Sequence, residues 1–149
     1  MSDNDIKQMV SGMPTPTFDN PAFVTPIALA KATVAIVTTA GIHRRGQEGF
    51  AARDTSYRVL DSDARDLEMG HWSPNFDRAG FAADINVVYP ADRLAELAAA
   101  GNIGAVAPRH LAFTGNQDET MTAMRIDSGP SAAALLKADG VDIVIFTPV

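Results

Sequence analysis

The clearest candidate β-strand in this sequence is Val141-Asp142-Ile143-Val144-Ile145-Phe146 (residues 141–146). A second run of the same kind is Thr33-Val34-Ala35-Ile36-Val37-Thr38-Thr39 (residues 33–39), which is mostly apolar and rich in β-branched side chains. Such runs are typical of strands that are buried on both faces, as in a parallel sheet covered by helices. The two runs therefore predict an α/β fold.

Segments of helical and extended character alternate between the two runs. Residues 91–100 predict a helix with one apolar face, and Gly101 follows at the usual C-cap position. The other predicted elements are strands at 57–60, at 85–89 and within 105–113, and helices at 118–127 and 131–139 with a break at Gly129-Pro130. This order predicts a Rossmann-like, three-layer α/β domain with a mostly parallel sheet. The first strand is followed by no glycine-rich dinucleotide motif, and the chain has no Walker A motif.

The chain divides into an arm and a domain. Proline recurs between Pro14 and Pro26, which disfavours a regular helix or a central strand there. We predict that residues 1–30 form a proline-rich N-terminal arm, extended over the surface or onto a partner. Residues 31–149 form the predicted α/β domain.

Bulk composition limits the possible classes of function. A chain of 149 residues with 46% hydrophobic residues suits a single globular domain. It has no apolar run of about 18 residues and no secretory h-region, so we expect a cytoplasmic protein without a membrane span. The net charge of −6, with scattered basic residues, argues against nucleic-acid binding. The absence of cysteine excludes disulfides, thiolate metal sites and cysteine nucleophiles within these residues.

The last predicted strand leads directly into Thr147, Pro148 and Val149. A parallel neighbour would require a crossover after it, and open α/β sheets bind ligands beyond the carboxyl ends of their strands. We therefore expect a domain that is truncated after its last strand, with a reactive group next to these three residues. An ordinary last or edge strand is the alternative.

Five short motifs lie in a fixed order along the chain. The motifs are Thr38 to His43, Asp54 to Arg58, Asp84 to Leu94, the segment from Ile103 to Gly115, and Gly140 to Thr147. Each is unspecific alone, but as an ordered set they resemble the selenoprotein B subunit of the glycine/sarcosine/betaine/D-proline reductase family. The resemblance covers about residues 30–149 and ends where the selenocysteine or cysteine of the family would follow.

This resemblance implies an oxidoreductase component that cleaves a carbon–nitrogen bond reductively in glycine, sarcosine, betaine or D-proline. A selenocysteine, encoded by UGA and read here as a stop, is expected after Val149, with no other cofactor in the chain. The implied partners are a reductase subunit with a pyruvoyl group and a thiol or thioredoxin-like reductant, and we also expect a homo-oligomer. Without its nucleophile, the chain is expected to be inactive alone.

Two histidines are candidate catalytic residues. His43 follows the first strand at its carboxyl end, and His110 lies in a later predicted strand. An imidazole titrates near neutral pH and can act as an acid, a base or a cation. Histidines that are simply buried and hydrogen-bonded are the alternative. No pair among the three histidines, His71 included, has i, i+4 spacing, so we predict no metal site and assign no role to His71.

Substrate binding is predicted at two polar clusters. Asp54, Ser56 and Arg58 could form one, because a guanidinium suits a substrate carboxylate; an exposed ion pair is the alternative. Asp84 and Asn86 flank an apolar run and could instead hold a loop through bonds to the backbone. The second interpretation of the whole chain is a noncatalytic α/β module that binds a small acid or a partner subunit.

Overall fold

The two apolar runs that predict the fold lie side by side. The structure, a computed structural model, describes residues 2–12, 24–72, 78–115, 117 and 120–149. In it, β1 (Thr33–Thr38) and β7 (Ile143–Thr147) pair in parallel over five positions, from Val34 opposite Ile143 to Thr38 opposite Thr147. β1 is buried along most of its length, which explains its continuous apolar sequence.

The other edge of β1 pairs in parallel with two short strands, β5 (Ala105–Val106) and β6 (Arg109–Ala112). β6 continues antiparallel to β3 (Arg58–Asp61), which closes that side of the sheet. A separate small sheet pairs β2 (Ile42–Arg44) with β4 (Leu67–Met69). The prediction of a mixed α/β domain with a mostly parallel sheet is therefore confirmed.

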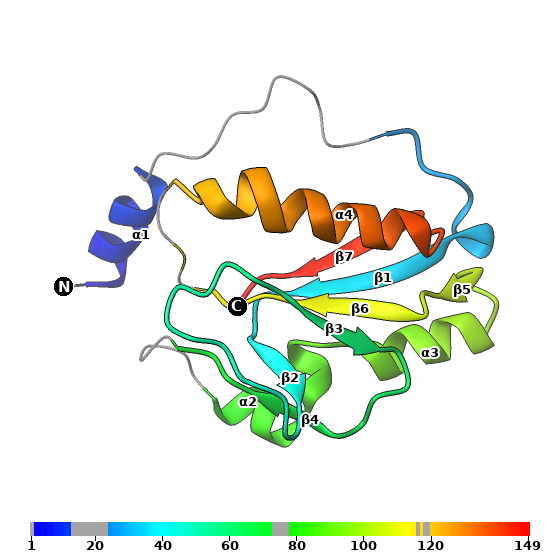
Figure 1. Ribbon diagram of the computed structural model, residues 1–149, viewed down its shortest axis with the longest axis horizontal. Coiled ribbons are helices and arrows are strands. Elements are labelled where there is room, and N and C mark those ends of the chain that lie inside the picture. The colour runs from blue at the N-terminus through cyan, green and yellow to red at the C-terminus, as the bar shows by residue number, and fades with distance from the viewer. Residues whose placement is uncertain (1, 13–23, 73–77, 116, 118–119) are drawn as a thin grey trace.

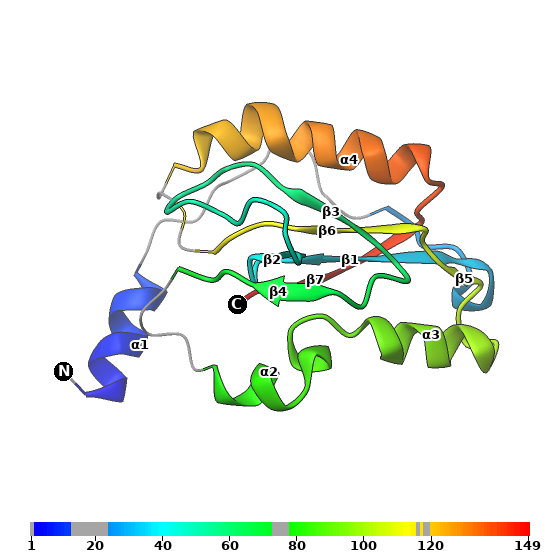
Figure 2. The same cartoon turned by 60° about the horizontal axis from the view of Figure 1, so that its bottom comes forward.

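Helices cover both faces of the main sheet, giving three layers (Figures 1 and 2). One face packs on α4 (Gly129–Ala138), which continues a π-helical segment, η3 (Met124–Ser128). The other face packs on α3 (Ala91–Ala99), preceded by α2 (Ala79–Ala83) and a 3-10 turn, η2 (Ile85–Val87). Side chains alternate between the two cores: Val34 and Ile36 face α3, whereas Ala35 and Val37 face α4.

Pro108 interrupts what the sequence predicts as one strand. The register of pairing with β1 shifts by two residues between β5 and β6, so the chain bulges there. The bulge brings the ring of His110 to the backbone of Ile36, whose N–H donates to His110 Nδ1 over 3.1 Å. A side chain thus replaces a main-chain acceptor inside the sheet.

Several local predictions were wrong. α1 (Asp3–Ser11) is a helix inside the predicted arm, because it ends before the first proline; residues 13–23 lie outside the described part. Residues 85–87 form a 3-10 turn rather than a strand, since Asp84 accepts a bond from the Asn86 N–H and starts the turn. Gly129-Pro130 does not break the helical layer, because proline occupies the first turn of α4, directly after η3.

The helix at 91–100 is confirmed as α3, and Gly101 adopts the positive φ of 73° that a C-cap glycine supplies. A short 3-10 turn, η1 (Leu29–Lys31), leads into β1. Within the described residues, no helix is long and apolar enough to cross a bilayer.

Candidate functional site

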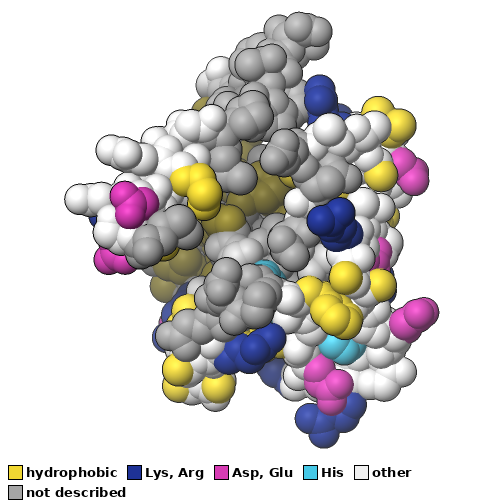
Figure 3. All heavy atoms as spheres, turned by 90° about the vertical axis from the view of Figure 1, so that its left-hand side faces the viewer, with side chains coloured by type: hydrophobic (Ala, Val, Ile, Leu, Met, Phe, Trp, Pro, Cys, Tyr) yellow, Lys and Arg dark blue, Asp and Glu magenta, His cyan; other side chains and the backbone are white. Residues whose placement is uncertain are grey.

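The carboxyl ends of β1, β6 and β7 meet at one edge of the sheet, on the left in Figure 1. Figure 3 looks onto this edge, which is hollowed at its centre, with apolar side chains in the hollow and histidine side chains visible on the face. In open α/β sheets, ligands bind at this edge. The chain reaches this edge at Thr39 after β1, at Gly115 after β6 and at Val149 after β7.

The backbone of Val149 is held by the side chain of Thr39. The hydroxyl Oγ1 of Thr39 accepts a bond from the Val149 N–H at 2.8 Å and lies 3.3 Å from the Val149 carbonyl oxygen, to which it can donate. Two residues earlier, the Thr147 hydroxyl donates to the Val88 carbonyl at 2.8 Å, and the Thr39 N–H donates to the Thr147 carbonyl. These contacts fix the end of β7 on both sides of Pro148.

His71 lies beside Val149 and is buried, with 7% of its surface exposed. Both groups approach Gly115: a Cβ there would meet the Val149 carbonyl oxygen at 2.7 Å and His71 Nε2 at 2.8 Å. Burial lowers the pKa of His71, and hydrogen bonding to the Val149 backbone opposes that shift. The ring therefore favours its neutral form, and only glycine fits at 115 without displacing one of the two neighbours.

The backbones of Gly41 and Gly70 cross at close range, and this crossing places His71 at the edge. Gly41 has a φ of +69°, and a Cβ on it would lie 3.0 Å from the Gly70 carbonyl. The Gly70 N–H donates to the Gly41 carbonyl at 3.0 Å, and the Gly41 N–H donates to the Phe113 carbonyl. The turn after β1 and the turn after β4 are thereby tied together, which places His71 opposite the end of β7.

His43 lies on the small sheet and is also buried. Its Nδ1 is 3.2 Å from the Gly41 carbonyl, and its Nε2 is 3.9 Å from a carboxylate oxygen of Glu68. The ring stands edge-on to Phe50, with 6.5 Å between ring centroids. Because Gly70 packs against the ring, His43 and His71 lie on neighbouring parts of the same edge.

Asp54, Ser56 and Arg58 come together, as the sequence predicts. Arg58 donates to the Ser56 hydroxyl, to Asp54 at 3.3 Å, and to the carbonyls of Glu48 and Gly49. Its guanidinium also lies 4.3 Å from the ring centroid of Phe50. Bonds from Ser56 and the charge of Arg58 lower the pKa of Asp54, against an opposing effect of burial.

The Arg58 cluster is connected to the strand ends and to His43. Phe50 contacts both the Arg58 guanidinium and the His43 ring, so it joins the two predicted groups. The Gln117 amide donates to the carbonyls of both Asp54 and Thr114, the residue before Gly115. The guanidinium of Arg58 is hydrogen-bonded to acceptors of the protein itself, so it stabilises the fold of this edge.

His110 is completely buried inside the sheet. Burial lowers its pKa to about 4, so the ring is neutral and Nδ1 can accept the Ile36 N–H. Tyr89 packs edge-on against the ring, with 5.6 Å between centroids, and burial raises the pKa of its phenol. The structure places His110 in the α3-side interior rather than on the edge where Val149 ends.

Asp84 and Asn86 form a cluster with Asp92. The Asn86 amide donates to Asp84 at 2.8 Å and to Asp92 at 3.1 Å, and its carbonyl oxygen accepts the Asp92 N–H. Bonds from Asn86 lower the pKa of Asp84. The cluster joins η2 to the start of α3, which is the loop-holding role considered from the sequence.

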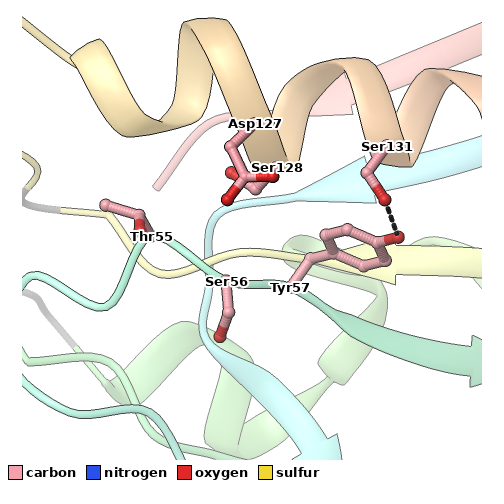
Figure 4. A pocket seen from close by; sticks show the side chains of 6 residues that line it. All are labelled: Thr55, Ser56, Tyr57, Asp127, Ser128 and Ser131. Atoms are coloured by element: carbon pink, nitrogen blue, oxygen red, sulfur yellow. Dashed lines mark hydrogen bonds between the residues drawn. The ribbon is translucent and has the colours of Figure 1, made fainter.

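A pocket of about 240 Å³ opens between the residues that precede β3 and the helical layer (Figure 4). Its lining is polar, and consists of Thr55, Ser56, Tyr57, Asp127, Ser128 and Ser131. The Tyr57 and Ser131 hydroxyls lie 3.0 Å apart across it. Among the described residues that line the pocket, none has a basic side chain.

Sequence reasoning missed His71 and Thr39. The available signal was a repeated pattern, in which Gly41 and Gly70 each follow a short strand and precede a histidine by one or two residues. What makes His71 notable is its contact with the end of β7, which depends on the fold. In the described part of the chain, no three His, Asp or Glu side chains form a group that could hold a metal ion.

Comparison with known proteins explains the order of the motifs. The sequence model of glycine/sarcosine/betaine reductase selenoprotein B matches residues 5–149. The chain belongs to this family. Curated relatives include the D-proline reductase subunit gamma of Acetoanaerobium sticklandii, which is 35% identical over 130 residues. That match covers 85% of this chain and 53% of the relative.

Two longer relatives give the same result. The glycine reductase complex component B subunit gamma of Carboxydothermus hydrogenoformans and the betaine reductase complex component B subunit beta of Peptoclostridium acidaminophilum are each 34% identical. Each match covers 91% of this chain and 32% of the relative, so the chain spans between a third and about half of these proteins. The relatives are subunits of reductase complexes. No solved structure matches the chain significantly.

Proposed function

We propose that this chain is the part of a selenoprotein B-type subunit that positions the nucleophile of an amine reductase. The reaction would be reductive cleavage of a carbon–nitrogen bond in glycine, sarcosine, betaine or D-proline. The observation that carries the proposal is the fixed end of β7, where Thr39 and His71 both contact the backbone of Val149. In this protein, a selenocysteine or cysteine would follow Val149.

The residues at this edge suit such a group. An ionised selenolate or thiolate attacks the carbon, forms a selenium–carbon or sulfur–carbon bond and displaces the amine nitrogen. A dithiol then cleaves that bond reductively: it becomes a disulfide, the carbon gains hydrogen, and the nucleophile is restored. The backbone at Val149 is held by the Thr39 hydroxyl, and the His71 ring, whose pKa burial lowers, lies beside it. Neither side chain carries a negative charge, so neither would repel an anion placed next to Val149.

Partners and compartment follow from the same proposal. A pyruvoyl-bearing subunit would hold amino substrates, and a thioredoxin-like thiol protein would supply the electrons. Both need a reducing compartment, which favours the cytoplasm. Self-association through the outer edge of β7 is also proposed, because an edge strand offers unpaired backbone groups to another chain.

The test uses the complete reading frame of the gene, expressed with the residue after Val149 as selenocysteine or cysteine. Mixed with the partner subunits and a dithiol, this protein should cleave the carbon–nitrogen bond of one of the four substrates, which releases ammonia or an amine from glycine, sarcosine or betaine and opens the ring of D-proline. A serine at that residue should abolish the cleavage, and the 149-residue chain should be inactive alone. Turnover by the 149-residue chain alone, or a reading frame that continues without selenocysteine or cysteine, would refute the proposal.

A noncatalytic binding module is the second candidate, and the polar pocket beside Tyr57 and Asp127 favours it. Its lining of hydroxyls and one carboxylate suits a neutral or cationic polar ligand. Saturable binding of such a ligand by the 149-residue chain, together with no turnover by the extended protein, would support this candidate instead.

A further inference from the structure

We infer that His71 is a positioning residue, which acts with Thr39 to fix the peptide at the Val149 carbonyl and so the direction of the next side chain. This inference rests on the proposed function, because it takes the next residue as the nucleophile. The geometric part concerns only residues of this chain, and we call His71, Thr39 and Val149 the clamp.

The clamp surrounds one residue, Val149, from two sides. Thr39 Oγ1 accepts the Val149 N–H at 2.8 Å and lies 3.3 Å from the Val149 carbonyl oxygen. The His71 ring interacts with the same backbone, and its Nε2 and the Val149 carbonyl oxygen both lie against Gly115. The Thr39 hydroxyl on one side and the buried His71 ring on the other leave Val149 less room to rotate than either side chain alone would.

The protein holds His71 rigidly enough for this role. The ring is buried, the Arg78 side chain donates to the His71 carbonyl at 3.1 Å, and the preceding Gly70 is bonded to Gly41. Gly41 in turn follows β1, the central strand against which β7 is in register. The imidazole and the end of β7 are therefore positioned by the same strand.

Gly115 provides the space in which the two groups meet. A methyl group there would lie within 2.8 Å of both the Val149 carbonyl oxygen and His71 Nε2, closer than any ordinary contact. One of the two must then move. Gly115→Ala should therefore move His71 and Val149 apart without removing any side chain of the clamp.

The consequence for catalysis is geometric. A nucleophile must point at the reacting carbon, and a misplacement of about 1 Å can cost about 100-fold in rate. Loss of the clamp should thus lower kcat while leaving KM within about twofold, because substrate is held elsewhere. A residue that served only the stability of the fold would not produce this split.

The first experiment needs neither a nucleophile nor a partner subunit. The ¹⁵N resonances of the His71 ring are recorded in the 149-residue chain, in Gly115→Ala and in Thr39→Val, with Gly80→Ala and Thr122→Val as matched controls. We expect both clamp variants to shift these resonances and both controls to leave them unchanged. Resonances that do not move in Gly115→Ala or in Thr39→Val overturn the clamp.

The second experiment uses the extended protein with its partner subunits. His71→Leu, which has no donor, should lower kcat at least tenfold, and His71→Gln, which keeps an N–H donor, should restore much of it. Thermal unfolding of each variant separates folding defects from positioning. An unchanged kcat in a folded His71→Leu protein overturns the inference. No turnover by the unsubstituted extended protein refutes the proposed function and this catalytic role, whereas the clamp is still judged by the resonances.

Discussion

The backbone N–H of Ile36, on the central strand, donates to the ring nitrogen Nδ1 of His110 at 3.1 Å, in place of a main-chain carbonyl. This bond requires a neutral ring. The first prediction follows from its titration, because burial lowers the pKa of His110 to about 4. The unfolded chain, with an imidazole pKa near 6.5, binds a proton more readily than the folded protein does.

Stability should therefore be lost as pH falls from about 6.5 to about 4. The loss attributable to His110 is about 3 kcal/mol in the free energy of unfolding. Urea unfolding at a series of pH values measures it. His110→Asn, whose amide oxygen can still accept the Ile36 N–H, should flatten this dependence. An equally steep pH dependence in His110→Asn would contradict the assignment.

The second prediction concerns Gly104, which packs against the turn before β1. A Cβ there would lie 2.5 Å from the Lys31 carbonyl carbon and 2.7 Å from its oxygen, and backbone cannot move aside easily. Gly104→Ala should destabilise the protein by about 1–3 kcal/mol. Gly80→Ala is the control, because its Cβ would meet only Val87 at 4.0 Å. Thermal denaturation that shows equal midpoints for the two variants would disprove the close contact.

The third prediction concerns the guanidinium group of Arg58. Lysine keeps the charge but cannot bond Asp54, Ser56 and the Gly49 carbonyl at once. Arg58→Lys should cost about 1–3 kcal/mol and loosen the loop before β3. Arg45→Lys, at an exposed site, should be nearly neutral. Limited proteolysis would report the loop, and an unchanged cleavage rate in Arg58→Lys would count against the prediction.

The fourth prediction concerns Asn86, which bridges Asp84 and Asp92. Asn86→Asp would place three carboxylates together, and their mutual repulsion raises their pKa values. The substitution should destabilise the protein at pH 7, and the penalty should shrink as pH falls toward 4. Asn102→Asp adds the same charge on an exposed turn and should show little of this. Chemical unfolding at pH 7 and pH 4.5 tests it, and a penalty that grows on acidification would reject it.

The sequence predicts best where local pattern decides structure. The apolar runs at 33–39 and 141–146 and the amphipathic segment at 91–100 all form the expected elements, because burial and capping act within a few residues. Residues 85–87 were predicted wrongly because one side chain, Asp84, overrides their β propensity by bonding to the backbone.

The site was predictable only in part. The proximity of Asp54, Ser56 and Arg58 follows from their spacing in the chain. The contact of His71 with Val149 joins residues far apart in sequence, through the crossing of Gly41 and Gly70, and periodicity does not report such contacts. The position of His110 was predicted, but its bond to Ile36 depends on the bulge at Pro108, which only the paired strands reveal.

The register between β1 and β7 has a consequence for how this edge can change. The Ile143 and Ile145 side chains face the α3 side and the Val144 side chain faces the α4 side, so side chains alternate between the two faces at every residue. Deleting one residue within β7 would turn the end of the strand, and with it the nucleophile that we propose after Val149, toward the opposite helical layer. Insertions or deletions of two residues keep the orientation and only lengthen or shorten the reach, so viable length variants of this strand should differ by even numbers.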